Sequence, residues 1–392
     1  MRQPHRSSRT SSMTRHDFID RDHQSSNNRV LVVVFLRGGA DAMTLVPPTG
    51  DDEYYKSRPT LAVDVDEALR LDGYFSLNPV LEPLHEYFMD GELGIVHGCG
   101  SEDTTRSHFE AQDLMEHGGN HGSGWLGRFL RAQQRTPAAL SAVAIGTIRP
   151  ESLRGAPAGA VMQTIRDFTF GESREGMLDH LAALYAAEQG ALGKAGQDTL
   201  AAVQRLRAIR ADSSDDAAQR GYPNTTFGRG LREIVRLVNA DVGLEATTVD
   251  LNGWDTHFVQ ARLIGGLMTE LGQGLSAFWK DLGHHRANVD VVVMTEFGRR
   301  LRENTSFGTD HGSGGALFVL GKAASTAGIA GKVKSGFESL DVRYRDEVGD
   351  MPANINYRDV LAPILRSHSP TLNLSQVFPA WTVKEHDSFS VM

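Results

Sequence analysis

The stretch VLVVVFLRGGAD, residues 30–41, decides the fold class. Residues 30–36 form a continuous apolar run rich in β-branched side chains, which is typical of a strand buried on both faces of a parallel sheet. The run ends in Arg37, Gly38 and Gly39, which mark a tight loop. Residues 30–36 therefore predict a central strand of an α/β fold, in which ligands bind beyond the carboxyl ends of the strands.

Further apolar runs predict the rest of the sheet. They lie at residues 93–97, 247–251, 289–295 and 316–320. Segments with helical periodicity lie between them, at residues 79–89, 108–117, 227–239 and 259–282. Strands that alternate with amphipathic helices indicate a mostly parallel central sheet flanked by helices.

The segment from about 153 to 222 differs from its surroundings. It is rich in Ala, Arg, Glu and Gln, and we expect no strand in it. Residues 177–211 have the periodicity of two helices with a break near residues 190–196. We predict a helical insertion in one α/β domain over residues 30–392, and its charged surface favours packing and solvation over chemistry.

Composition limits the partners of the chain. It has 392 residues with 40 Lys and Arg against 49 Asp and Glu, a net charge of −9. This balance argues against nucleic acid as a partner, because phosphate contacts need a basic face. The single cysteine, Cys99, excludes an internal disulfide and a thiolate metal cluster.

The first 29 residues are polar and rich in Ser, Arg and Asn. They contain no apolar run of the length that a signal peptide or a membrane span requires. We therefore interpret residues 1–29 as a disordered tail. We expect a cytoplasmic protein with no membrane partner, and the sequence makes no prediction of its oligomeric state.

Ionisable and hydroxyl side chains recur beside the predicted strands. Because the carboxyl ends of parallel strands share one edge of a sheet, these side chains would converge there. They are Arg37, Asp41, Ser107, His108, Asp255, His257, Glu296, Arg299, Asp310 and His311.

Each of these residues also has an ordinary interpretation. Asp41 could be a turn residue or a helix N-cap, and Ser107 could cap the helix that begins near residue 108. Glu296 and Arg299 could form an ion pair at a helix start. The occurrence of all these residues together favours a functional site. Helix caps and ion pairs that had nothing to do with one another would not need to lie at the carboxyl ends of strands in every case.

The stretch FGTDHGSGGALFVLG, residues 307–321, raises the same choice. Its glycines could form a hinge with solvated charges beside it. Alternatively, the small residues clear space so that Asp310 and His311 can reach a metal ion or a phosphate-like group.

The donor set indicates the kind of ion. Carboxylates and imidazoles without thiolates suit zinc, manganese, magnesium or iron. Two such ions can activate a hydroxyl nucleophile and stabilise the leaving oxygen of a phosphoryl or sulfuryl group. Arginine side chains would bind the remaining anionic oxygens.

Several motifs resemble a known bacterial family, domain of unknown function 1501, which is grouped with the alkaline phosphatase and sulfatase superfamily. The resemblance spans roughly residues 30–366. The motifs include LVVVFLRGGADAMTLVPP, TRSHFEAQDLMEHG, GWDTH, VVVMTEFGRR and GTDHGSGGALFVLG.

The resemblance implies an alkaline phosphatase-like core and specific site roles. Asp41, Asp255, His257, Glu296 and His311 resemble metal ligands. Ser107 stands where the superfamily has a nucleophilic Ser or Thr.

The chain also departs from the superfamily pattern. Phe297 stands where a histidine ligand would follow the acid, so one metal site would lose a ligand or use Asp310 or His108 instead. The spacing between Asp255 and His257 is shorter than usual. The segment 14–19 resembles a twin-arginine export signal, but it has one arginine and no apolar stretch behind it.

We therefore predict a divalent-metal-dependent hydrolase acting on a small anionic phosphate or sulfate ester. In this hypothesis Ser107 is the nucleophile, His108 an acid or base, and Arg37 or Arg299 binds the anion. The alternative is a non-catalytic metal- or anion-binding protein on the same fold.

Overall fold

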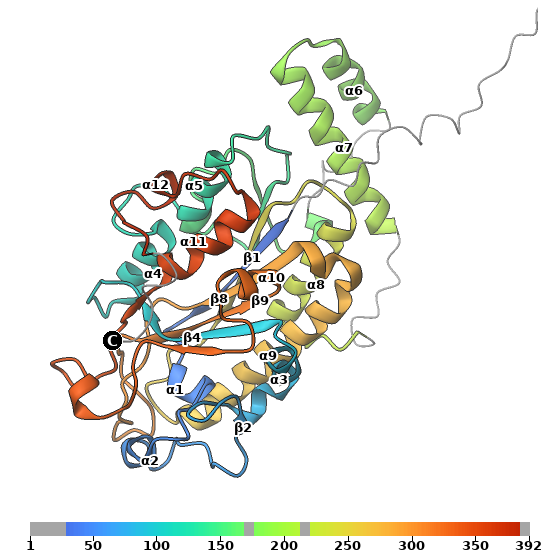
Figure 1. The fold of residues 1–392 in the computed structure, drawn as a ribbon. Coiled ribbons are helices and arrows are strands. Elements are labelled where there is room, and N and C mark those ends of the chain that lie inside the picture. The colour runs from blue at the N-terminus through green and yellow to red at the C-terminus, as the bar shows by residue number, and fades with distance from the viewer. Residues whose placement is uncertain (1–28, 168–175, 212–219, 385–392) are drawn as a thin grey trace, which may run out of the picture.

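A computed structural model describes residues 29–167, 176–211 and 220–384 of this chain. The tail expected over residues 1–29 lies outside the described residues, apart from Arg29. The described chain is built around one large sheet with helices on both of its faces (Figure 1).

The central strand is β1 (Val30–Arg37), as the sequence predicts. It pairs in parallel with β7 (Ala246–Asn252) on one side and with β8 (Val289–Met294) on the other. The full order is β10-β4-β9-β8-β1-β7-β5-β6, and β11 also pairs with β4. The remaining strands of this sheet are β4 (Leu93–Gly100), β5 (Ala142–Ile145), β6 (Ala160–Met162), β9 (Gly315–Leu320), β10 (Val333–Ser335) and β11 (Ile355–Asn356).

One strand of the sheet runs against the others. β9 pairs antiparallel with both β4 and β8. Its first residue therefore lies at the edge where β1, β4, β7 and β8 end. The reversal brings Asp310 and His311, which precede β9, to the edge that the parallel strands already define.

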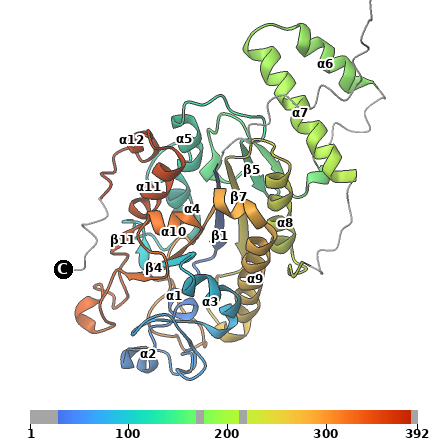
Figure 2. The same ribbon diagram turned by 45° about the vertical axis from the view of Figure 1, so that its right-hand side comes forward.

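Alternation along β1 divides the apolar core into two layers. Val32, Val34 and Leu36 belong to one buried cluster, whereas Leu31, Val33 and Phe35 belong to the other. Helices α3 (Glu82–Met89), α8 (Thr226–Asn239) and α9 (Gln260–Asp281) cover the first face. The second face is covered by α4 (His108–His117), α5 (Trp125–Ala132), α10 (Lys322–Thr326) and α11 (Tyr357–His368) (Figures 1 and 2). The expected α/β class, a mostly parallel sheet flanked by helices, is confirmed.

Four helices agree closely with their sequence patterns. They are α3 (Glu82–Met89), α4 (His108–His117), α8 (Thr226–Asn239) and α9 (Gln260–Asp281). The others are α1 (Ala42–Leu45), α2 (Asp52–Ser57), α5 (Trp125–Ala132), α10 (Lys322–Thr326), α11 (Tyr357–His368) and α12 (Leu374–Val377). A separate small sheet pairs β2 (Leu69–Arg70) with β3 (Ser76–Leu77).

The predicted insertion contains two helices, α6 (Met177–Ala187) and α7 (Ala191–Ala211), which protrude together from the rest of the chain (Figures 1 and 2). The break between them falls just before Ala191. The expectation of no strand in 153–222 is wrong, because β6 lies there and extends the sheet beside β5. A three-residue edge strand is too short to show a periodic pattern.

No described helix combines the length with the apolar character that crossing a bilayer requires.

Candidate metal centre

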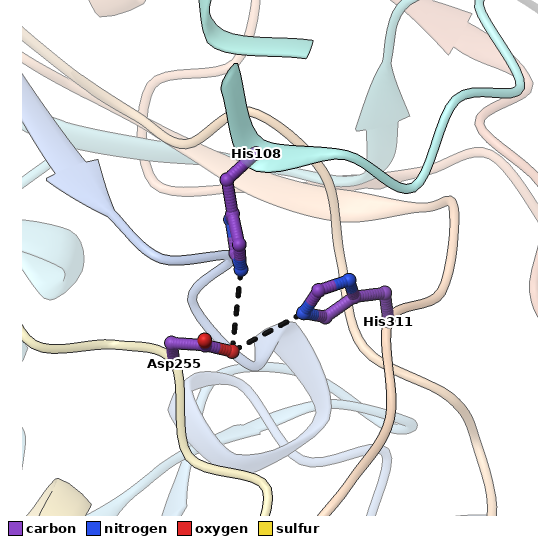
Figure 3. Close-up of side chains that lie close together, drawn as sticks. All are labelled: His108, Asp255 and His311. Atoms are coloured by element: carbon purple, nitrogen blue, oxygen red, sulfur yellow. Dashed lines mark hydrogen bonds and ion pairs between the residues drawn. The ribbon is translucent and has the colours of Figure 1, made fainter. Parts of the chain in front are cut away.

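Four side chains meet at the carboxyl edge of the sheet. His108 is the first residue of α4, Asp255 and His257 lie in the loop after β7, and His311 lies shortly before β9. Figure 3 shows His108, Asp255 and His311 pointing toward one another from these separate segments. One donor atom from each of these three lies within 4.8 Å of the others.

A single carboxylate oxygen is the centre of this group. Asp255 Oδ1 lies 3.2 Å from His108 Nε2, 3.0 Å from His257 Nε2 and 3.1 Å from His311 Nε2. The Nε2 atoms of His257 and His311 are themselves 2.9 Å apart. Three imidazole nitrogens therefore crowd around one oxygen.

The opposite ring nitrogens determine what those Nε2 atoms can do. His311 Nδ1 lies 2.8 Å from the carbonyl oxygen of Arg106, which can only accept, so Nδ1 donates its hydrogen. His108 Nδ1 lies 2.8 Å from the carboxylate of Glu296 and donates in the same way. In the neutral rings the Nε2 atoms of His108 and His311 then carry lone pairs directed at Asp255.

The arrangement fits a bound cation. His108 Nε2 is buried and has no hydrogen-bond partner, although an oxygen lies within 3.2 Å. Lone pairs that face a carboxylate and one another repel unless a positive charge lies between them. Histidine rings held through Nδ1 by a carboxylate or a carbonyl are typical of metal-ligating histidines. His108, Asp255, His257 and His311 would thus hold an ion with nitrogen and oxygen donors.

The protonation equilibria of Asp255 and His311 agree with this interpretation. Burial alone would raise the pKa of Asp255, but the hydrogen bond and the charge of Arg299 outweigh it and hold that pKa well below its usual range. Burial lowers the pKa of His311, which favours the neutral ring. The hydrogen bond to Glu296 raises the pKa of His108 above its ordinary value of 6.5, so a proton competes with a metal ion there.

Two residues of the centre are accessible to solvent. The side chain of Asp255 is 47% exposed and that of His257 is 38% exposed. A catalytic metal site needs such an open position for its substrate.

Two predicted ligands lie behind the histidines instead of beside the ion. Glu296 Oε1 accepts from His108 Nδ1, from Gln112 Nε2 at 2.9 Å and from the Gly38 amide at 2.8 Å. Burial alone would raise the pKa of Glu296, but these bonds lower it, so it stays ionised. Glu296 thus orients His108 and is not placed as a ligand.

Asp310 has a similar supporting position. Its Oδ1 accepts from Asn304 Nδ2 at 3.1 Å and lies 3.4 Å from His257 Nδ1. Asn304 Nδ2 also donates to the carbonyl oxygen of His257. Asp310 and Asn304 therefore hold His257 at its Nδ1 atom and its backbone, away from the Nε2 atom that faces Asp255.

Asp41, a further predicted ligand, lies in a buried ion pair. Both of its oxygens accept from the guanidinium of Arg58, and they also accept from Thr44, Gln260 and the Met43 amide. Burial alone would raise the pKa of Asp41, but Arg58 lowers it. The carboxylate already has a full set of protein partners, so we reassign Asp41 from metal ligand to structural ion pair and helix N-cap.

The two arginines expected to bind the anion are also engaged by the protein. Arg37 contacts Asp250, Gln112 and Glu116. Arg299 is fully buried and donates to the carbonyl oxygens of Gly38, Gly39, Trp254 and Thr309 and to Asp255 Oδ1. Because Arg299 is fully buried and Arg37 already contacts three side chains, we reassign both arginines from anion binding to holding the loops in place.

Ser107 directly precedes the candidate ligand His108, and Phe297 packs against two of the histidine rings. Ser107 is exposed at the N-cap of α4, yet its side chain makes no capping hydrogen bond. Phe297 is buried, and its ring centroid lies 4.9 Å from that of His108 and 4.7 Å from that of His311. The phenyl ring thus packs directly against two candidate ligands.

Some contributors were missed at the sequence level. Gln112 lies four residues after His108 on α4 and so on the same helix face, a spacing that could have identified it. Arg58 had no such signal, because only the fold brings it to Asp41.

The fold and the site together define an α/β protein with a candidate histidine and aspartate metal centre at the carboxyl edge of its sheet. The chain belongs to the family described as protein of unknown function (DUF1501), which matches residues 94–359. The family expected from the sequence motifs is thereby confirmed.

Two solved structures are similar to this chain. One is the C-terminal periplasmic domain of EcEptC from Escherichia coli in complex with Zn, at 10% identity and a TM-score of 0.40 over 92% of this chain and 88% of that one. The other is alkaline phosphatase from the Antarctic bacterium TAB5, at 10% identity and a TM-score of 0.33 over 87% of this chain and 98% of that one. A search among curated proteins found no match.

The first of these structures is a periplasmic domain. This finding goes against the cytoplasmic location expected from the sequence, and we withdraw that expectation.

Proposed function

We propose that this chain is a metal-dependent hydrolase of phosphate or sulfate esters. One observation carries the proposal: the Nε2 atoms of His108, His257 and His311 converge on Asp255 Oδ1 at 3.0–3.2 Å. We further propose a single ion, because Phe297 packs against two of the rings where a second ion would need a ligand.

The bound ion would supply Lewis acidity, lowering the pKa of a hydroxyl and stabilising negative charge on a leaving oxygen. Residues around the centre orient the side chains that would bind this ion. Glu296 and the Arg106 carbonyl hold the rings of His108 and His311 with their Nε2 atoms turned inward. Arg299 fixes the carboxylate of Asp255 at 2.7 Å.

Ser107 is the proposed nucleophile. It directly precedes His108, and its exposed hydroxyl is not used in capping α4. Attack of Ser107 Oγ on phosphorus or sulfur would break the ester bond, and the hydroxyl proton would leave with the alcohol. Water would then hydrolyse the seryl ester and regenerate the hydroxyl.

The test combines metal analysis with an ester screen. Protein purified without chelator is expected to contain about one divalent ion per chain and to hydrolyse an aryl phosphate or an aryl sulfate. His311→Ala should lose both metal and turnover. His117→Ala is the matched control, because His117 lies at the other end of α4 and pairs with Glu151 instead.

A second substitution tests the covalent step. Ser107→Ala should keep the metal and lose turnover. If Ser107→Ala hydrolysed the ester normally while removal of the metal stopped the reaction, Ser107 would not be the nucleophile.

The alternative is a protein that binds a metal or an anion without turnover. The packing of Phe297 beside the centre favours it, because a phenyl ring provides no donor that could hold a second ion to stabilise a leaving group. A stably bound ion together with no hydrolysis across the screen would support this alternative.

A further inference from the structure

The site needs a cation for the anionic group of its substrate. Arg37 and Arg299 are already engaged by the protein, so the charge has to come from other residues. Two other arginines beside the centre, Arg106 and Arg300, are partly exposed and make few hydrogen bonds within the described chain.

Arg106 and Arg300 share one carboxylate oxygen. Arg106 NH2 lies 3.0 Å from Asp350 Oδ2, and Arg300 Nε lies 3.2 Å from the same atom. Both arginine side chains are 35% exposed, whereas that of Asp350 is 3% exposed. The buried carboxylate thus holds two guanidinium groups close together and leaves the trio with one net positive charge.

The backbones of both arginines touch the segment that carries His311. The carbonyl oxygen of Arg106 accepts from His311 Nδ1 at 2.8 Å, and the amide of Arg300 donates to the Asp310 carbonyl at 2.9 Å. Arg106 also directly precedes Ser107 in the chain. The pair therefore flanks the loop that carries one candidate ligand and adjoins the proposed nucleophile.

Most of the hydrogen-bonding capacity of the pair is unused within the described chain. Arg106 donates once, to Asp350, and Arg300 donates to Asp350 and, at 3.4 Å, to the Val348 carbonyl. A guanidinium carries five N–H donors in a fork that matches two oxygens of a phosphate or sulfate group.

We propose that Arg106 and Arg300 form an anion-binding fork that recognises the tetrahedral oxyanion of the substrate, a phosphate or a sulfate group. Asp350 is a positioning residue, because it holds the two side chains together without touching the substrate. The inference rests on the proposed function, since it assigns a substrate-binding role at the same site.

Calorimetric titration with inorganic phosphate tests the fork. It is performed on the zinc-loaded protein after unbound zinc has been removed. Arg106→Gln and Arg300→Gln are each expected to raise the Kd for phosphate about tenfold, the loss of one charged hydrogen-bonding group. Zinc content should not change, because neither side chain contacts a candidate ligand through its guanidinium.

Arg302→Gln is the matched control. Arg302 is exposed, lies two residues from Arg300 and carries the same charge. Its substitution should change the Kd for phosphate by less than twofold. An equal loss in all three variants, or no loss in any, would overturn the fork in favour of unspecific attraction or of binding elsewhere.

Lysine variants control for the possibility that the glutamine variants misfold. Arg106→Lys and Arg300→Lys keep a positive charge beside Asp350 but cannot present two parallel N–H bonds. They should keep the melting temperature of the wild type and bind phosphate several-fold more weakly. Lysine variants with wild-type affinity would contradict recognition by a fork.

The same variants separate this inference from the proposed function. Fork-dependent phosphate binding without hydrolysis of any ester would refute the hydrolase and leave the fork in place. Hydrolysis with an unchanged KM in the double lysine variant would refute the fork and leave the hydrolase in place.

Discussion

Glu296 and Asp41 are both buried carboxylates beside strand ends, yet their partners differ. Glu296 accepts from His108 and so orients a candidate ligand, whereas Asp41 neutralises Arg58. Both are acidic residues that follow a strand of the central sheet by a few residues. What separates their roles is the side chain that lies opposite.

Glu296→Gln should lower zinc affinity about 10–100-fold, the usual effect of removing the partner of a ligating histidine. The neutral amide no longer holds the Nδ1 hydrogen of His108 by charge. Competition with a metal-sensitive chelator measures the change. Glu151→Gln is the control, because Glu151 pairs with His117 at the same 2.8 Å distance. Equal zinc affinity in both variants would remove the orienting role.

Asp41→Asn should lower the free energy of unfolding by about 3–5 kcal/mol at pH 7, because it leaves the buried Arg58 without its counter-charge. The fold holds the pKa of Asp41 below its ordinary value. Its stabilisation is therefore present above the unfolded pKa of about 3.9 and is lost as the pH falls further.

Urea unfolding of the wild type and of Asp41→Asn between pH 3 and pH 7 measures this effect. The difference between them should be constant near neutrality and shrink below about pH 4. A difference that persisted undiminished at pH 3 would contradict the linkage.

The loops at the carboxyl edge are held together by close backbone contact. The segment after β8 and the segment before β9 form a bridge between Arg299 and His311. A Cβ atom on Gly312 would lie 2.5 Å from the Arg299 carbonyl carbon. Glycine at this position therefore makes room for a neighbouring backbone segment. This role differs from both roles considered for the glycines of residues 307–321, a hinge and a clearing of space for a ligand.

Gly312→Ala should destabilise the protein by about 1–3 kcal/mol, as overpacking does, and weaken zinc binding by displacing His311. Gly265→Ala is the control, because a Cβ there meets nothing within 4 Å and lies inside α9. Thermal unfolding and zinc titration of both variants measure the contrast. A normal zinc affinity in Gly312→Ala would show that the bridge does not position His311.

The protruding helices are joined unequally to the rest of the molecule. Leu206 of α7 is 1% exposed and belongs to the same apolar cluster as the core side chains of α8 and α9. Helix α6 has no buried residue, and its Leu184 is 55% exposed. The part of α7 around Leu206 thus belongs to the main core. Helix α6, in contrast, packs mainly on α7.

Leu206→Ala should cost about 2–5 kcal/mol of stability, the range for a leucine deleted from a core. Leu184→Ala, the same substitution at an exposed position, should change stability by less than about 0.5 kcal/mol. Chemical denaturation of both variants tests whether α7 unfolds with the core. Equal, small effects would indicate that the helical pair does not contribute to the main domain.

The main strands and helices were predictable because their signals are local. The apolar run at residues 30–36 and the helical period at 108–117 each lie within one segment, and both elements form where expected. β5 and β6 have only four and three residues, too few for a period to show. The antiparallel direction of β9 could not be predicted from the sequence either, because it depends on which strands lie beside β9 in the folded sheet.

The sequence by itself determined the α/β class and the family. It also determined that Asp255, His257 and His311 lie next to strands, in loops at the carboxyl edge of the sheet. Only the tertiary structure decided which of the candidate side chains face one another, and it assigned Asp41 to Arg58 and Glu296 to His108. The physical reason is that ligation, ion pairing and hydrogen bonding depend on contacts across the fold: Glu296 and His108 are 188 residues apart in the chain and 2.8 Å apart in space.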